Sequence, residues 1–360
     1  MTRQRHFSDK WYLTIIAVTL ALNSAAGQQF EGTVTANGEQ PLVGALVKAE
    51  AKGGIQTVVT KTDSNGYFAL SDLKTDPILL SIELDGKLLF RAIVPSRPQS
   101  PLNISLPTPI RKTGSWVPVD LASGTGSTVF VLDRDNAVSK ITVDSRGSRL
   151  ESVFVLPQSH ALSAIAASQQ SVLVTGNNGA DCSIFRYSIE TKSLSSKTIS
   201  GQGSCAGIAT DGNVLYVVFT DRKEIKFWKS WDSGSYGLWR FDDMRTPGPL
   251  FLDESGHQLL LADTSTGTLY SVSVTDGKAK MVATNIGWAA ALAANSKHIA
   301  IASGKKILFV SRADYRGEDP PTNLKSLTGG NIVGLAIDGK GRLWFADYDK
   351  HLVQGPVSIN

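Results

Sequence analysis

The sequence predicts an all-β protein with two domains, a β-sandwich followed by a six-bladed β-propeller. Two observations carry this prediction. Short runs of alternating apolar and polar residues, bounded by turn residues, fill positions 28–106 without a helical period. An apolar strand motif then recurs at nearly constant spacing through the rest of the chain. The 33 glycines among 360 residues agree with a fold that needs many tight turns.

The first 26 residues are interpreted as a signal peptide. Arg3, Arg5 and Lys10 precede a mostly apolar run, Trp11 to Leu22, and small residues follow at 24–26. The run of 12 residues is shorter than the roughly 20 that a membrane-spanning helix needs. We therefore expect an exported protein, periplasmic or extracellular. The alternative is an uncleaved segment, which would be the chain's one route to a membrane.

The charge balance argues against a nucleic-acid partner. The formal net charge of the whole chain is +4. Removal of the predicted signal peptide takes away three basic residues and one acidic residue, which leaves +2. An imbalance this small is far from the basic surface that nucleic-acid binding requires.

Residues 28–106 are expected to form the sandwich. Seven strands are predicted, at Phe30–Thr35, Ala45–Ala51, Gln56–Lys61, Tyr67–Leu70, Ile78–Leu84, Lys87–Val94 and Leu102–Leu106. This density of short strands is typical of a sandwich. The Asp-Ser-Asn-Gly segment at 63–66 begins like a calcium loop, but the distal Glu of such a loop is missing, and we interpret it as a turn.

The same stretch resembles the carboxypeptidase regulatory-like domain. The resemblance rests on Gly32-Thr33-Val34, on Pro41 to Val47 (PLVGALV), on Thr60, Thr62 and Asp63, and on Asn65 to Phe68 (NGYF). It implies a transthyretin-like Greek-key sandwich that acts as an accessory module and contributes no catalytic residues. Some relatives belong to a carbohydrate-binding-like superfamily, so the resemblance also keeps glycan binding open. Five prolines between 95 and 109 then lead into an expected linker at 107–113.

Residues 114–360 are expected to form the propeller. The recurring motif is an apolar strand that often ends in Asp, and its copies end at Asp133, Gly176, Phe219, Asp263, Ser303 and Asp347. Successive copies are 43, 43, 44, 40 and 44 residues apart, which is the period of propeller blades. A strand of small residues precedes most copies and a third strand follows. We therefore predict a four-stranded meander in each repeat, with the small residues on the innermost strand.

The repeats resemble NHL-type and related six-bladed propellers, most clearly from Gly334 to Asp347 (GLAIDGKGRLWFAD). The resemblance implies an architecture and no particular activity. Some six-bladed propellers are calcium-dependent lactonases with a Glu, Asn and Asp set in the channel, and no such set matches here.

Two further motifs are interpreted as structural. Gly334 to Lys340 begins like a phosphate-binding loop, but Gly341 stands where Ser or Thr is required. Gly203 to Gly207 is similar to a nucleophile elbow centred on Cys205, but it leads into a strand rather than a helix. We expect no catalytic residues, no resident metal and no cofactor, with calcium as the alternative.

Two groups of residues are candidates for binding. The first group lies just before the innermost strands, where a channel mouth is expected: Trp116, His160, Ser204, Arg245, Trp288 and Asn331. The second lies in or beside an expected insertion at Thr220–Tyr236 in the third repeat: Trp228, Trp231, Tyr236 and Trp239. Aromatic residues beside cations suit recognition of a protein or a glycan. The alternative is that they pack a long hairpin.

Cys182 and Cys205 fall in adjacent predicted blades, and they either form a disulfide or remain two buried thiols. We interpret the chain as an exported, non-catalytic binding or scaffolding protein that engages a protein or glycan through a propeller face. The alternative is a propeller hydrolase or lyase that acts on a small ester, lactone or glycan, with calcium as its candidate metal. A purely structural envelope protein is a third reading, and the sequence predicts no oligomeric state.

Overall fold

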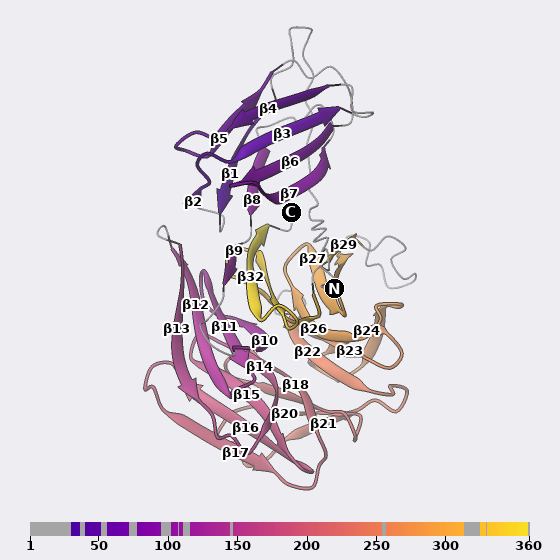
Figure 1. Ribbon diagram of the computed structural model, residues 1–360. Helices are drawn as coiled ribbons and strands as arrows, with labels where there is room; N and C mark the ends of the chain where they lie inside the picture. The colour runs from indigo at the N-terminus through magenta and orange to yellow at the C-terminus, as the bar shows by residue number, and fades with distance from the viewer. Residues whose placement is uncertain are drawn as a thin grey trace, which may run out of the picture. The chain divides into compact units, whose positions relative to one another are not determined.

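The computed structural model describes residues 30–36, 40–51, 56–71, 78–94, 102–106, 108–110, 116–144, 147–253, 257–312, 325–328 and 330–358. Every regular element in these ranges is a β-strand, so the all-β prediction is confirmed (Figure 1). The chain divides into two compact units, which meet in the sequence between Leu106 and Pro107. In the described part, no helix has the length and apolar character needed to cross a membrane. The predicted signal peptide lies outside the described residues.

The first unit is a sandwich of two four-stranded sheets. One sheet contains β1 (Phe30–Ala36), β2 (Gln40–Pro41), β5 (Tyr67–Leu70) and β8 (Leu102–Leu106). The other has the order β4-β3-β6-β7, with β3 (Leu46–Ala51), β4 (Thr57–Lys61), β6 (Ile78–Leu84) and β7 (Lys87–Val94). Strand β8 pairs parallel to β1, whereas β2 and β5 pair with β1 antiparallel.

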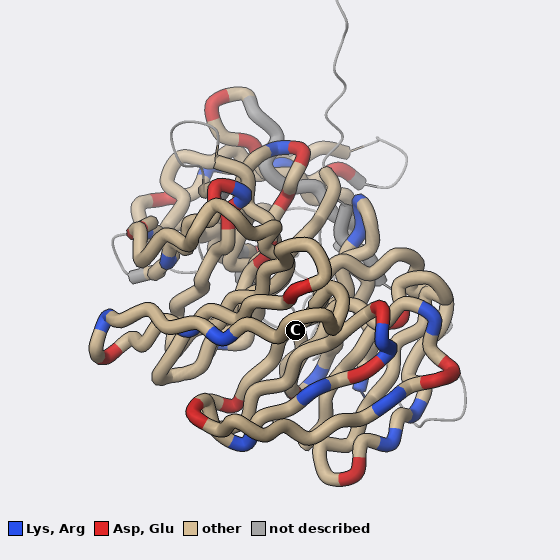
Figure 2. Tube along the Cα trace, turned by 90° about the horizontal axis from the view of Figure 1, so that it is seen from below, with Lys and Arg blue, Asp and Glu red and all other residues tan. Residues whose placement is uncertain are grey.

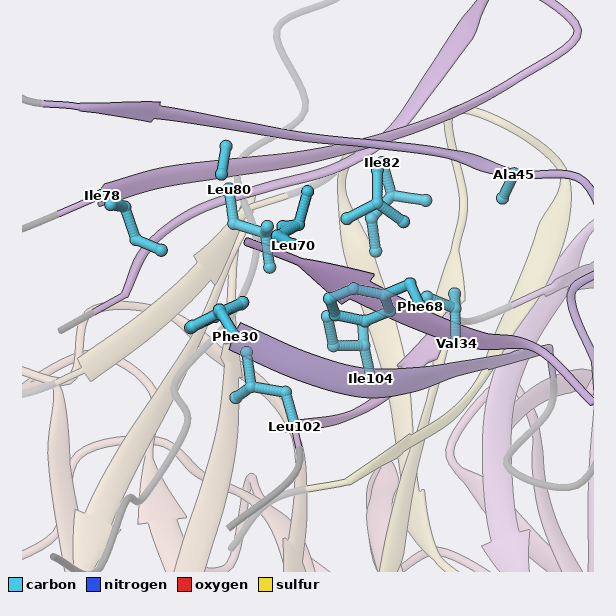
Figure 3. Packing of buried hydrophobic residues seen from close by; sticks show 12 residues of the cluster. Phe30, Val34, Ala45, Phe68, Leu70, Ile78, Leu80, Ile82, Leu102 and Ile104 are labelled. Carbon is cyan, nitrogen blue, oxygen red and sulfur yellow. The ribbon is translucent and has the colours of Figure 1, made fainter. Parts of the chain in front are cut away.

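The core of this unit follows from the period-two pattern. Alternate residues of β1 and β6, among them Phe30, Val34, Leu80 and Ile82, are buried and point into the space between the sheets (Figure 3). The segment at 63–66 is a turn, as expected, because Asp63 Oδ1 accepts hydrogen bonds from the N–H groups of residues 65 and 67.

The described residues of the second unit form six four-stranded sheets. The first three are β10 (Pro118–Ser123), β11 (Thr128–Asp133), β12 (Ala137–Asp144) and β13 (Gly147–Val155); β14 (Ala161–Ala167), β15 (Ser171–Asn178), β16 (Asp181–Ser188) and β17 (Leu194–Ile199); and β18 (Cys205–Thr210), β19 (Leu215–Phe219), β20 (Glu224–Trp228) and β21 (Gly237–Arg240).

The next two are β22 (Pro247–Asp253), β23 (Gln258–Asp263), β24 (Thr268–Ser273) and β25 (Ala279–Ala283); and β26 (Ala289–Ala294), β27 (His298–Ser303), β28 (Lys306–Ser311) and β29 (Lys325–Thr328). The sixth contains β30 (Ile332–Ile337), β31 (Arg342–Asp347), β32 (Leu352–Ser358) and β9 (Thr108–Ile110).

The first strands of the six sheets form a closed ring. Strand β10 contacts β14, β14 contacts β18, and the series continues through β22, β26 and β30 back to β10. The labelled members of this ring lie toward the middle of the unit in Figure 1. Each sheet is therefore one blade of a propeller, with its first strand innermost. All six second strands lie where the repeat spacing predicts them.

The prediction of a linker at 107–113 is wrong for residues 108–110, because these residues form strand β9. This strand pairs antiparallel with β32 and supplies the outermost strand of the sixth blade, so the ring closes with strands from both ends of the unit. Local pattern did not reveal β9, because a strand of three residues beside two prolines resembles a linker. Pro109 is tolerated there because an outermost strand needs hydrogen bonds along one edge only.

The prediction of an insertion at Thr220–Tyr236 is also wrong, because this segment contains strand β20. Strand β20 follows β19 after a short turn in which Lys223 adopts a positive φ of 53°. Residues 237–240 form the fourth strand of this blade, β21, and residues 229–236 connect it to β20. Glu224 and Lys226 obscured β20 in the sequence, because charged residues are rarely buried and suggested a solvent-facing loop, whereas both side chains are buried here.

Candidate ligand site in the propeller channel

The six innermost strands enclose a cavity of about 520 Å³. Its walls are mainly small or aliphatic residues such as Ala164, Ala206, Ile208, Leu292 and Leu335. Each innermost strand pairs with its own blade along one edge only, so the N–H and C=O groups of its other edge face the channel. The cavity continues to the turns that follow these strands, where exposed Thr125, Gln169 and Ser296 line an opening to solvent.

Charged side chains are scarce on these strands. Lys, Arg, Asp and Glu residues elsewhere are interspersed along turns and outer strands (Figure 2), whereas the six innermost strands contain only Asp120 and Asp253. The side chain of Asp253 is buried and forms an ion pair of 2.6 Å between its Oδ2 and Arg312 Nη1. Among the described residues, Asp120 has no ion-pair partner, which distinguishes it from Asp253.

A repeated irregularity places Asp120 in the channel wall. Every innermost strand has a β-bulge near its start, and the residues that follow the bulge are Asp120, Ala164, Gly207, Leu250, Ala291 and Gly334. A bulge redirects the side chains after it. Five of these six equivalent positions hold an apolar residue or glycine, so one carboxylate interrupts an otherwise apolar ring.

The carboxylate of Asp120 is bound to two backbone amides. Its Oδ1 accepts the N–H of Leu121 at 2.8 Å, and its Oδ2 accepts the N–H of Ile165, on the neighbouring blade, at 3.0 Å. Burial raises the pKa of Asp120 to about 7, because desolvation of the charged form outweighs the two hydrogen bonds that lower it. Asp120 was not singled out from the sequence, since a single Asp in a strand carries no motif.

None of the six residues expected at the channel mouth lines this cavity. Trp116 is buried between the first and sixth blades. His160 is half-buried, with its Nε2 3.0 Å from Ser183 Oγ and its ring edge-on to Phe185. Trp288 is 69% exposed. The cavity is instead lined from the bulges onward, because the residues before each strand belong to turns outside the ring.

The other three, Ser204, Arg245 and Asn331, are exposed. Their backbone N–H groups donate to carboxylates at or just after the ends of second strands: Asp221, Asp263 and Asp349. Of these three, Asp263 ends a copy of the motif, and Asp347, which ends another, likewise accepts the N–H of Gly330 before its own blade. Asp263, for example, accepts from the N–H groups of residues 245 and 246 before its own blade and of residue 265 in the following turn. The recurrent Asp therefore has a structural role, because its carboxylate binds backbone N–H groups of two neighbouring loops.

The aromatic group expected as a partner surface is largely internal. Trp228 is 3% exposed and belongs to the core between the second and third blades, so it is corrected to a core residue. Trp231 is half-buried, and its ring lies 5.7 Å from the guanidinium of Arg186 and 5.3 Å from Lys197 Nζ. Trp239 packs against Phe227 in a tilted arrangement, with ring centroids 4.4 Å apart. Tyr236, at 48% exposed, is the outward member.

Sequence reasoning missed a buried lysine beside this group. Lys226 is 1% exposed, and its Nζ donates to Gln202 Oε1 at 2.8 Å and lies 3.5 Å from Glu224 Oε1. The same Nζ lies 4.6 Å from the ring of Tyr236 and 4.8 Å from the ring of Phe219. The cation is therefore matched by a carboxylate and two aromatic faces.

Cys182 and Cys205 form a disulfide that joins the second and third blades, with their Cα atoms 5.7 Å apart. Asn177 reinforces this junction, because its side-chain amide bonds to both the N–H and the C=O of Cys205. Among the residues that the structure describes, no group of three or more His, Cys, Asp or Glu side chains is arranged to hold a metal ion.

Comparisons with known proteins agree with the two units. Residues 29–107 match the family described as carboxypeptidase regulatory-like domain, which confirms that prediction. No curated protein matches the sequence. Similar solved structures include a streptogramin B lyase, at 14% identity over 69% of this chain and 96% of that chain, with a TM-score of 0.50.

A Bacteroides thetaiotaomicron protein of unknown function is 14% identical, covers 86% of this chain and 89% of its own, and has a TM-score of 0.51. A chain from a nidogen/laminin complex is 12% identical, covers 81% and 98%, and has a TM-score of 0.51. At these identities the likeness is one of fold alone. The first unit of this protein is therefore a carboxypeptidase regulatory-like domain, and the second has a β-propeller fold.

Proposed function

We propose that this chain is an exported, non-catalytic binding protein whose propeller holds a small ligand in its central cavity. The cavity carries the proposal. It has the volume of a small-molecule site, and its walls combine small and aliphatic side chains with polar groups in similar measure. Its polar rim opens to solvent, which gives a ligand an entry route.

Binding is favoured over catalysis by the arrangement of the lining carboxylates. In general acid–base catalysis a positioned side chain transfers a proton to or from the substrate, and many such reactions use one acid and one base. Asp253 is committed to Arg312, which leaves Asp120 as the lining carboxylate without an ion pair among the described residues. Export is supported by the predicted signal peptide and by the disulfide, since disulfides persist in oxidising compartments. The sandwich then acts as an accessory module.

The cavity is tested by filling it. Ala290 lines the channel at a bulge, and Ala290→Phe should abolish the thermal shift that wild type gives with 1-hexanol. Ala279→Phe is the matched control, because Ala279 is exposed on an outermost strand and should leave the shift unchanged. A shift that survives in Ala290→Phe would place binding outside the channel.

A second candidate function is engagement of a protein or glycan at the face where the innermost strands begin. It is favoured by Trp288, whose exposed ring lies in the turn before β26. Trp288→Ala should lower capture of a glycan or protein partner from a displayed panel. Equal capture by the variant and wild type would count against this face.

The hydrolase or lyase alternative remains a prediction, and the lyase among the fold neighbours does not decide it. Turnover of a small ester, lactone or glycan by the purified chain, dependent on added calcium, would favour it over simple binding.

A further inference from the structure

We propose that the channel selects a primary alkylammonium ligand, with the ammonium group on Asp120 and the alkyl chain along the apolar wall toward the polar rim. The inference rests on the proposed function and names the ligand class of the same cavity. It follows from the position of one carboxylate, from its unused hydrogen-bonding capacity and from the composition of the walls beside it.

Asp120 has capacity for a cation. A carboxylate offers about four lone-pair sites, and the amides of Leu121 and Ile165 occupy one on each oxygen. Each oxygen therefore retains acceptor capacity, and the residue lines the cavity. A primary ammonium group carries three N–H donors, and a charge-assisted hydrogen bond to a carboxylate is among the strongest that proteins make.

The wall around Asp120 suits an ammonium group better than a neutral or anionic one. The channel-facing edges of the innermost strands present backbone C=O groups as well as N–H groups, and the C=O groups can accept the ammonium N–H donors that do not bind Asp120. The flanking innermost strands, β14 and β30, contain no charged residue that competes for the carboxylate. An anion at this position would face the carboxylate, and a neutral alcohol would gain only a single weaker hydrogen bond.

The alkyl chain is accommodated by the rest of the channel. Asp120 lies three residues before the end of β10, about 10 Å along the strand at 3.3 Å per residue. Between Asp120 and the rim, the lining includes Ala122, Ile165, Ile208 and Ile337. A linear chain on the ammonium group therefore passes apolar side chains before it reaches the hydroxyl and amide groups of the rim.

The experiment compares hexylammonium, 1-hexanol and hexanoate by isothermal titration calorimetry on the full mature chain. Hexylammonium should bind about tenfold tighter than 1-hexanol, which corresponds to one charge-assisted hydrogen bond, and hexanoate should bind weakest. Asp120→Asn should remove the preference for hexylammonium and leave 1-hexanol within about threefold of wild type. Asp242→Asn is the matched control, because Asp242 is exposed outside the cavity and should change nothing.

The comparison of hexylammonium with 1-hexanol on the wild-type chain does not need the variant. The test therefore remains valid if Asp120→Asn fails to fold. Equal affinity for hexylammonium and 1-hexanol overturns the role of Asp120 and keeps the cavity as a binding site. Absence of binding by all three probes overturns both the ligand class and the proposed function. Retention of the hexylammonium preference in a folded Asp120→Asn chain also overturns the assignment to this carboxylate.

Discussion

Asp120 should make the stability of the propeller depend on pH in a direction opposite to that of most carboxylates. Burial raises its pKa in the folded chain from 3.8 to about 7. The folded chain therefore binds a proton more tightly than the unfolded chain between these values. Its contribution to the free energy of unfolding is fully present below pH 3.8 and is lost as the pH rises through 7.

The size of the effect follows from the two pKa values. Between pH 8 and pH 5, proton linkage with these values stabilises the folded state by about 3 kcal/mol. Because Asp120 is only partly buried beside an open cavity, solvent screening reduces this figure, and we expect about 1–2 kcal/mol. The flanking strands β14 and β30 carry no titratable side chain that would share the proton.

The assay is urea denaturation of wild type and Asp120→Asn at pH 5, 6, 7 and 8. Asn keeps one acceptor for the amides of Leu121 and Ile165, so loss of the other hydrogen bond contributes a cost of about 1 kcal/mol that does not depend on pH. The difference in unfolding free energy, wild type minus variant, should grow as the pH falls from 8 to 5, while other titrating groups cancel. A difference that stays constant across this range, or that shrinks on acidification, would refute a raised pKa at Asp120.

Three further predictions concern the propeller framework and are also measured by urea denaturation. Glu224→Gln should cost about 3–5 kcal/mol, because it leaves the Lys226 cation buried without its carboxylate, and a cost below about 1 kcal/mol would contradict that pairing. Gly334→Ala should cost about 1–3 kcal/mol, because a Cβ there would lie 2.8 Å from backbone atoms of the neighbouring innermost strand. Gly234→Ala, where a Cβ meets open space, is its control, and equal losses in the two variants would show that close approach is not the cause. Reduction of the disulfide, whose cysteines are 23 residues apart, should cost about 3 kcal/mol, and an unchanged midpoint in reductant would argue against a stabilising bond.

The sequence alone determined the features that depend on local pattern. The second strands of all six blades, from β11 to β31, lie at the positions that the 43-residue spacing predicts. The sandwich strands likewise follow the period-two alternation that runs through β1 and β6. Both sets of strands could be predicted because a half-buried strand places apolar residues on one side at every second position. That pattern involves only residues close together in the sequence.

The tertiary structure decided what depends on partners distant in the sequence. Strand β9 became a strand only because β32 had an unpaired edge, more than 240 residues later in the chain. Trp228 became a core residue because the second blade covers it, whereas its neighbours Lys226 and Lys229 suggested a solvent-facing loop. The same reason hid the candidate site. Asp120 lies in a channel only because the innermost strands of six repeats close around it. No local sequence pattern indicates that enclosure.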